Sequence, residues 1–328
     1  MLVVVAVVVF APAAFGGAVG PGQPGTLALI RGPVSQFAQS RRYLAWLTPP
    51  NQNCITQLTL LDPGTGRRWS ARGVANEGCA TDAMALAGRR AYWQGGIYSS
   101  DGIDEELQSE ALGDKGSRFL DDESVGVSNP AAIVPVSSDG SSVYAATGTP
   151  GPIRRWVGLR SHPVTGKLSH PTALGAGGGR FAVAVLTRGK PAEASVLLKS
   201  HSGSSLGRFE AGGRVTALAV SASTLAALVR NRSGARIEIF LPHPRTVVLP
   251  RPPSTDFTPG SSPRLSASGS TIIYHVGKAI YALNGQQGAP HVIGHAASWP
   301  IGLSIVGRRV AWAESGRHAS RIRAINLP

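Results

Sequence analysis

The stretches GRRVAWAESG (residues 307–316) and RRYLAWLTPP (residues 41–50) share a basic turn, an apolar residue, Ala and Trp, although they lie near opposite ends of the chain. Aligning the sequence on this motif finds seven copies. They begin at Gln36, Ala83, Pro135, Ala173, Ala217, Arg264 and Gly302. In each copy an apolar and a small residue precede a turn, and glycine occupies that turn in five of the seven copies. Because tight hairpins often need a positive φ, each copy predicts a strand, a turn and a second strand.

The copies recur every 38 to 52 residues, which is the spacing of four-stranded propeller blades. Two further strands can be found after several hairpins, for example KAIYALN and HVIGH after the sixth copy. The 41 glycines and 24 prolines are too many for a helical protein. A sandwich or a β-helix would show no common register or a shorter period. We therefore predict an all-β fold, a seven-bladed β-propeller of four-stranded antiparallel blades.

The two ends of the chain complement each other. The seventh copy is followed by a third strand, RIRAIN from Arg321, but by no fourth, whereas TLALIRG from Thr26 is a strand without a blade of its own. Pairing the two would close the ring and leave few exposed sheet edges. We expect one propeller domain over residues 21–328, with a closing strand at about 26–31. Its blades would begin near residues 36, 83, 135, 173, 217, 264 and 302.

Two copies carry a family resemblance. PVSSDGSSVYAAT (135–147) and RLSASGSTIIYHVGKAIYALN (264–284) resemble the repeat unit of TolB-type and WD40-like β-propellers, a small residue, Ser-x-Asp-Gly and two apolar strands. Only one copy keeps the Asp-Gly pair, Asp139 and Gly140, and the Trp-Asp dipeptide of WD40 repeats is absent. The resemblance covers nearly the whole chain after its first residues. It implies the fold and leaves the function open, because propellers support binding, scaffolding and several chemistries.

The first twenty residues, MLVVVAVVVFAPAAFGGAVG, predict export. An uncharged apolar run from Leu2 to Phe10 is followed by small residues and prolines, as in a secretory signal peptide, although no basic residue precedes the run. The alternative is an uncleaved membrane anchor, because the uncharged stretch up to Val19 approaches the ~20 residues of a membrane span. Both interpretations place the rest of the chain outside the cytoplasm, as a secreted, periplasmic or surface-attached protein.

The chain has two cysteines, Cys54 and Cys79. In an exported protein the simplest interpretation is a structural disulfide, and two buried thiols are the alternative. In a propeller the loop with Cys54 and the loop with Cys79 would flank the first blade on one face. A bond between them would close a 24-residue loop and contribute about 3 kcal/mol by restricting the unfolded chain.

The net charge of +14 is unevenly distributed. Nine of the eighteen acids fall within residues 101–123, and beyond Glu123 there are 22 Lys and Arg residues against 6 acids. Such a surplus attracts polyanions, for example lipid headgroups, anionic wall polymers or nucleic acid. An arginine-rich surface without a ligand explains it as well. An electrostatic mechanism would be rejected if binding to anionic vesicles or heparin did not depend on salt.

Candidate metal ligands are weak. In SSDGIDEE (99–106), Asp101 and Asp104 could contribute oxygen ligands to Ca²⁺, but the ligand ladder of a calcium loop is absent and part of the run reads as a strand. His291 and His295 have a spacing that brings ligands together only on a helix, and HVIGH reads as a strand. We therefore predict no metal site.

Two other motifs are assigned to the framework. LGAGGGRF (174–181) lacks the Lys-Ser/Thr of a phosphate-binding loop and is interpreted as a glycine-rich inner hairpin of blade four. Trp46, Trp93 and Trp312 recur at one repeat position, which indicates packing between blades.

No catalytic motif and no cofactor motif is recognisable. We expect a non-catalytic binding or scaffold protein, a monomer without a cofactor, whose partner is a protein or an anionic envelope polymer. Nucleic acid is not an expected partner, and a membrane is expected only through a retained N-terminal anchor. The alternative is a propeller enzyme, a lyase or hydrolase with carboxylate or His side chains at the channel mouth. Three or more ionisable side chains converging there would favour the enzyme, and a mouth of Ser, Gly and Ala would exclude it.

Overall fold

The computed structural model describes residues 24–74, 80–98, 102–114, 118–126, 136–146, 151–169, 171–187, 190–231, 234–250 and 265–328. Within these residues the chain forms 28 β-strands and no helix. The strands make seven antiparallel sheets of four strands each. The predicted seven-bladed propeller is therefore confirmed, and the predicted export segment lies outside the described residues. None of the described residues belongs to a helix that is long and apolar enough to cross a membrane.

Each blade contains four strands, and six of the seven blades are continuous in sequence. Blade one contains β2 (Gln36–Gln39), β3 (Leu44–Leu47), β4 (Ile55–Leu61) and β5 (Arg68–Val74), and blade two contains β6 (Ala80–Ala87), β7 (Arg90–Tyr98), β8 (Gly102–Ala111) and β9 (Arg118–Gly126). Blade three contains β10 (Ser137–Ser138), β11 (Val143–Ala146), β12 (Ile153–Val157) and β13 (Arg160–Pro163), and blade four contains β14 (Pro171–Gly177), β15 (Arg180–Thr187), β16 (Lys190–Ser200) and β17 (Ser205–Ala211). Blade five contains β18 (Arg214–Val220), β19 (Leu225–Asn231), β20 (Gly234–Leu241) and β21 (Arg245–Val248), and blade six contains β22 (Leu265–Ser268), β23 (Thr271–Val276), β24 (Ala279–Asn284) and β25 (His291–His295). Blade seven contains β26 (Pro300–Val306), β27 (Arg309–Glu314), β28 (Ala319–Asn326) and β1 (Gly25–Arg31).

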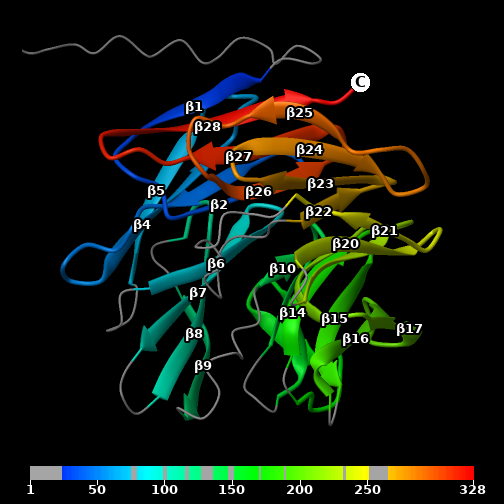
Figure 1. Cartoon of the computed structure of the whole chain (residues 1–328). Helices are drawn as coiled ribbons and strands as arrows, with labels where there is room; N and C mark the ends of the chain where they lie inside the picture. The colour runs from blue at the N-terminus through cyan, green and yellow to red at the C-terminus, as the bar shows by residue number, and fades with distance from the viewer. Residues whose placement is uncertain are drawn as a thin grey trace, which may run out of the picture.

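The first strand of every blade lies on the inside of the ring. In Figure 1 the inner strands β2, β6, β10, β14, β22 and β26 lie around the middle, and outer strands such as β5, β9, β17 and β21 lie at the rim. Each inner strand contacts the inner strands of both neighbouring blades. The order of the blades around the ring is therefore the order of the chain, and blade seven meets blade one.

The ring is closed by strands from both ends of the chain. β1 pairs with β28 in antiparallel fashion, with Leu29 opposite Arg321 and Arg31 opposite Ala319. In Figure 1 the blue β1 lies beside the red β28. The predicted closing strand is confirmed, and it supplies the outer strand that blade seven lacks.

The repeated tryptophans pack between blades, as predicted. Trp46 lies among residues of blade seven, Trp93 among residues of blade one and Trp312 among residues of blade six, so each contacts the preceding blade. Val310 shares the Trp312 cluster, whereas Ala311 lies in the cluster shared with blade one. Because successive side chains of a strand point to opposite faces, β27 thus packs against blade six on one face and against blade one on the other.

Four inner strands contain a β-bulge at the same place. The register shifts at Thr81/Ala83, Pro171/Ala173, Val215/Ala217 and Ile301/Ser304. These strands begin two or three residues before the predicted blade starts, because the strand continues on the far side of the bulge. The sequence pattern captured only the part of each strand after the bulge.

The glycine-rich hairpin of blade four is explained by close packing. A Cβ added to Gly177 would collide with the carbonyl group of Val220 in the inner strand of blade five. Glycine is therefore needed so that the two backbones can approach. The five glycines of the repeated turn have another role, because all of them have a positive φ: Gly88, Gly140, Gly178, Gly269 and Gly307.

Candidate ligand-binding face

The two faces of the propeller differ in the turns that form them. The turns between first and second strands and between third and fourth strands emerge on one face, which we call the hairpin face. The remaining loops emerge on the opposite face. The inner turns, those between first and second strands, surround the central axis, so the hairpin face includes one mouth of the channel.

Neighbouring inner turns are hydrogen-bonded to each other. The Ser40 hydroxyl donates to the Gly88 carbonyl at 3.1 Å, and the Gly88 amide donates to the Gly140 carbonyl at 3.0 Å. The Ser221 hydroxyl likewise donates to the Gly269 carbonyl at 2.6 Å. These bonds fix the inner turns of adjacent blades against one another and make the mouth a rigid platform.

A partly buried arginine joins blade seven to blade one. Arg309 Nε donates to Gln39 Oε1 at 2.9 Å, and Arg309 Nη2 donates to the Ser40 carbonyl at 2.7 Å. Gln39 Nε2 donates in return to the Ser304 carbonyl of blade seven at 2.9 Å. Burial lowers the pKa of Arg309 from its ordinary value. Within blades four and five, Arg180 has the same role toward the Ser221 carbonyl.

Three inner turns carry an Arg-Arg pair, and they belong to blades seven, one and two, which are neighbours in the ring. In each pair the second arginine bonds within the framework. Arg42 forms an ion pair with Asp62 at 2.8 Å and Arg90 forms one with Asp114 at 2.8 Å, while Arg309 holds blade one. The bond from Arg42 lowers the pKa of Asp62.

The first arginine of each pair faces outward. Arg41, Arg89 and Arg308 are exposed, and no acid among the described residues forms an ion pair with any of them. Arg308 Nε donates to the Leu327 carbonyl at 2.9 Å, which directs its guanidinium along the face. Since the three turns are neighbours, they form a continuous basic arc over three blades. We call these three residues the arginine arc.

The inner turns of the other four blades carry small residues at the equivalent position, namely Ser141, Gly179, Ser223 and Ser270. Asp139 is the acid in these turns. Its carboxylate accepts bonds from the Ser141 and Ser142 amides at 2.9 and 2.7 Å and from the Tyr144 hydroxyl at 3.1 Å. The one Asp-Gly of the repeats thus stabilises its own turn. At this mouth the unpaired ionisable groups of the described turns are three arginines, which donate hydrogen bonds and do not accept protons. They reach the number set for the enzyme alternative, but they are not the carboxylate or His side chains which that alternative requires. This arrangement can hold an anion.

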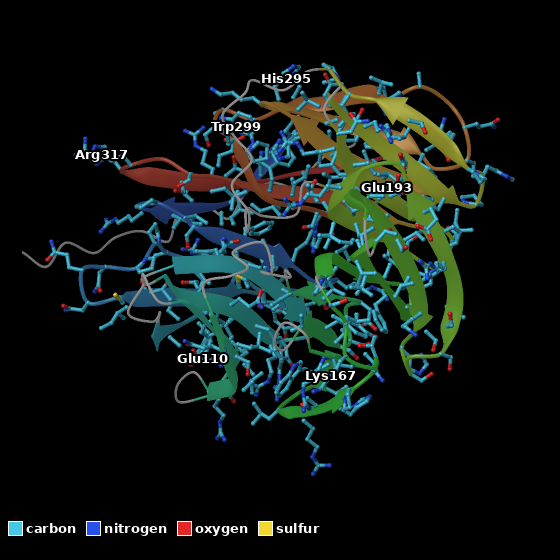
Figure 2. The ribbon with its side chains drawn as sticks, turned by 60° about the horizontal axis from the view of Figure 1, so that its bottom comes forward. Glu110, Lys167, Glu193, His295, Trp299 and Arg317 are labelled. Atoms are coloured by element: carbon cyan, nitrogen blue, oxygen red, sulfur yellow. The ribbon has the colours of Figure 1, made fainter. Side chains whose placement is uncertain are left out.

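Glu110 is a buried acid that no sequence pattern distinguishes from the other acids of residues 101–123. Its side chain in β8 is fully buried, and neither carboxylate oxygen has a hydrogen-bond partner. Figure 2 shows Glu110 on the teal strands of blade two. Burial, with a smaller contribution from Asp114, raises its pKa to about 7, and Arg90 acts in the other direction. A carboxyl group in this state ionises near neutral pH.

The predicted site residues are only partly described. Asp101 and Cys79 lie outside the described residues, and Asp104 lies in β8, as expected for a run that is partly strand. Cys54 has a positive φ of 57° in the loop after β3. The disulfide between Cys54 and Cys79 stays a prediction. In the part of the chain that the structure describes, no group of three or more potential ligands could hold a metal ion.

His291 and His295 lie at the two ends of strand β25, as predicted from their strand pattern. On the opposite face, His275 makes an edge-on contact with Trp299, their ring centres being 5.9 Å apart. The Trp299 side chain is 37% exposed. Figure 2 shows Trp299 and His295 on the side of the ring away from Glu110.

The arginine arc was missed because the Arg-Arg pairs were interpreted as parts of a turn. The signal was in the alignment, where the position after the turn glycine is Arg in blades seven and two and blade one also has an Arg-Arg pair. The repeat pattern indicates that blades seven and one are neighbours. It does not indicate which of the two arginines in a pair points outward.

The comparisons with known proteins support the fold. No family model matches the chain, and no curated protein matches it. Among solved structures, the propeller domain of the Trilobed protease from Pyrococcus furiosus is similar with a TM-score of 0.57 and 9% identity, covering 90% of this chain and 96% of that one. A chain of the Mitotic Checkpoint Complex has a TM-score of 0.55 and 11% identity and covers 99% of both chains. BamB from Moraxella catarrhalis has a TM-score of 0.50 and 12% identity and covers 95% of both. At these identities the likeness is one of fold, and the chain is a β-propeller.

Proposed function

We propose that the protein is a non-catalytic binding or scaffold propeller that works outside the cytoplasm and holds an anionic partner of the cell envelope on its hairpin face. The observation that carries the proposal is the arginine arc, in which Arg41, Arg89 and Arg308 project from three adjacent turns without an acidic partner among the described residues. The export signal predicted for the first twenty residues supports the location.

The rigidity of the mouth supports a binding role. Bonds between neighbouring turns hold the backbone from which the arc projects before any ligand arrives, so little backbone ordering remains to be completed on binding. Arginine is suited to carboxylate, phosphate and sulfate groups because its planar guanidinium donates in parallel pairs. The similar structures include a protease domain and a chain of an assembly, so the fold itself favours neither role.

The proposal can be tested with heparin as a soluble polyanion probe. We expect the wild-type chain to be retained on a heparin column at low salt and released as salt rises, because exposed charges are screened. The triple variant Arg41→Gln, Arg89→Gln, Arg308→Gln should elute at clearly lower salt. The matched control is Arg317→Gln, a single exposed arginine in the loop between β27 and β28 on the opposite face.

A second control equalises the charge. The triple variant removes three charges, so a further variant should remove three exposed charges elsewhere: Arg317→Gln together with Lys167→Gln and Lys278→Gln. Equal elution of the two triple variants would reject the hairpin face as the binding surface. The location is tested by fusing a reporter enzyme that is active only outside the cytoplasm to the C-terminus, and an inactive fusion would reject export.

A further inference from the structure

Three features of different kinds lie on the hairpin face. The first is the arginine arc, described above. The face also carries exposed arginines at its outer turns, and these are Arg67, Arg68, Arg118 and Arg160. The described acids next to these turns, Asp62 and Asp114, are held in ion pairs with Arg42 and Arg90. Over blades one and two the described charge of the face is therefore basic from the mouth to the rim.

The second feature is apolar. Seven large apolar side chains among the described residues are exposed, and four of them lie in or next to outer turns of the hairpin face. They are Val157 (49% exposed), Leu159 (40%), Leu206 (54%) and Val292 (46%). Val157 and Leu159 flank a turn whose next residue is Arg160, so apolar and basic groups project from one tip.

This tip is held in place. The buried Tyr92 hydroxyl of blade two donates to the Gly158 carbonyl at 2.8 Å, which fixes the turn between Val157 and Leu159. Apolar tips beside arginines suit a lipid interface, where the arginine meets the headgroup and the apolar side chain meets the acyl boundary.

The third feature is where the described chain begins. β28 is the third strand of blade seven, so its end near Ala324 lies at the hairpin face. Gly25, the first residue of β1, pairs with Ala324, and Arg31, the last, pairs with Ala319. β1 therefore starts at the hairpin face and runs away from it. Arg323 Nη2 donates to the Pro24 carbonyl at 2.9 Å and fixes this starting point. In the sequence, the apolar stretch from Leu2 to Val19, in its alternative interpretation as a membrane anchor, ends five residues before Pro24, a reach of at most about 17 Å for an extended chain.

We infer that the hairpin face rests on a membrane that contains anionic lipids, with the arginine arc over the headgroups and the apolar tips at the interface. This inference rests on the proposed function and names its partner as a lipid surface. A soluble anionic polymer would account for the arginines, but not for the apolar tips or for the place where the chain enters the ring. Two weak signals acting together are what stable membrane attachment requires.

The inference predicts a defined dependence on charge. Each arginine near an anionic surface is worth about a fivefold change in the equilibrium constant at low salt. Neutralising the three residues of the arginine arc should therefore lower the equilibrium constant for contact between the hairpin face and the anionic membrane about a hundredfold. The effect should fade as salt rises, since the Debye length shrinks from about 10 Å at 0.1 M to about 3 Å at 1 M.

The experiment uses the full chain reconstituted in vesicles. A photoreactive phenylalanine analogue replaces Leu159 on the hairpin face or, in a separate variant, Trp299 on the opposite face. The vesicles contain phosphatidylethanolamine with 30% phosphatidylglycerol, or phosphatidylcholine alone, and lipid adducts are measured by mass spectrometry. We expect adducts from position 159 in the anionic vesicles and at least fivefold fewer in phosphatidylcholine, in 1 M salt and in the arc triple variant. Position 299 should give none.

The control is Arg317→Gln. Figure 2 shows Arg317 at the outer tip of the red hairpin of blade seven, and its substitution should leave the number of adducts unchanged. Circular dichroism and thermal unfolding establish that each variant is folded. Equal adducts from positions 159 and 299, or adducts that survive the arc triple variant, would overturn the inference. If lipid adducts fail while heparin binding still depends on the arc, the partner is a soluble polyanion. In that case the proposed function stands and the membrane inference does not.

Discussion

Replacing Arg309 by Ala should weaken the seam at which the ring closes. The substitution removes the bonds to Gln39 Oε1 at 2.9 Å and to the Ser40 carbonyl at 2.7 Å. A hydrogen bond from a charged donor contributes about 1.5 kcal/mol net, so the two together contribute about 3 kcal/mol. For a domain of this size that corresponds to a fall in melting temperature of roughly 6 °C.

The assay is denaturant unfolding of three variants under one set of conditions. Arg308→Ala is the matched control, because it removes the adjacent, exposed arginine and should cost less than about 1 kcal/mol. Arg180→Ala is the internal comparison, since it removes the equivalent bonds between blades four and five. Hydrogen exchange then locates the damage. We expect faster exchange in β2 and β26 for Arg309→Ala, and in β14 and β18 for Arg180→Ala.

The reasoning would be refuted by either of two results. One is a free energy of unfolding for Arg309→Ala within about 0.5 kcal/mol of wild type, which would mean that water replaces the guanidinium at no cost. The other is faster exchange spread evenly over all seven blades. An even response would show that the whole ring unfolds as one unit and that Arg309 does not control a seam.

Three further predictions test other features. Glu110→Gln should stabilise the fold by about 2 kcal/mol at pH 8 and change its stability little at pH 5. Because the pKa of Glu110 is raised to about 7 in the folded state, its contribution to wild-type stability is complete below about pH 4.5 and is lost as the pH rises to about 7. A difference between the two proteins in urea melts that does not depend on pH would contradict this. Gly177→Ala should destabilise by about 1 to 3 kcal/mol through its collision with Val220, with no loss if the blades can separate there. Peptide mapping without reductant should find Cys54 joined to Cys79, and Cys54→Ser should cost about 3 kcal/mol under oxidising conditions; equal stability of the oxidised and reduced wild type would argue against the bond.

The fold could be predicted from the sequence because a propeller repeats its physical constraints. Every inner hairpin must pack an apolar side chain against a neighbouring blade and turn tightly beside the axis, so one pattern recurs seven times. The closing strand was predictable for the same reason, since the seventh blade lacked an outer strand and Thr26 began a strand that had no blade. Without β1, blade seven would have only three strands, and with it all seven blades have four.

Features that depend on a single location were not predictable. The repeated bulges need no distinctive residue, so Thr81 and Val215 look like ordinary members of a strand. Glu110 lies in an acidic run, where alternation suggests outward side chains, yet the strand from Leu107 to Ala111 is buried on both faces because it lies in the middle of a blade. Burial of this kind depends on the neighbouring blades and not on local sequence.

The Arg-Arg turn explains how one motif can both build the ring and bind a partner. The first arginine is exposed in the turn, and the second opens the strand in blades two and seven or follows within the turn in blade one, where its guanidinium reaches an acid or the next blade. Consecutive residues of a hairpin therefore have separable roles. Substituting Arg309 should cost stability with the arc intact, whereas substituting Arg308 should cost anion binding with the ring intact. A framework function for the motif and a ligand-binding function are thus not alternatives, because they belong to different residues of the same pair.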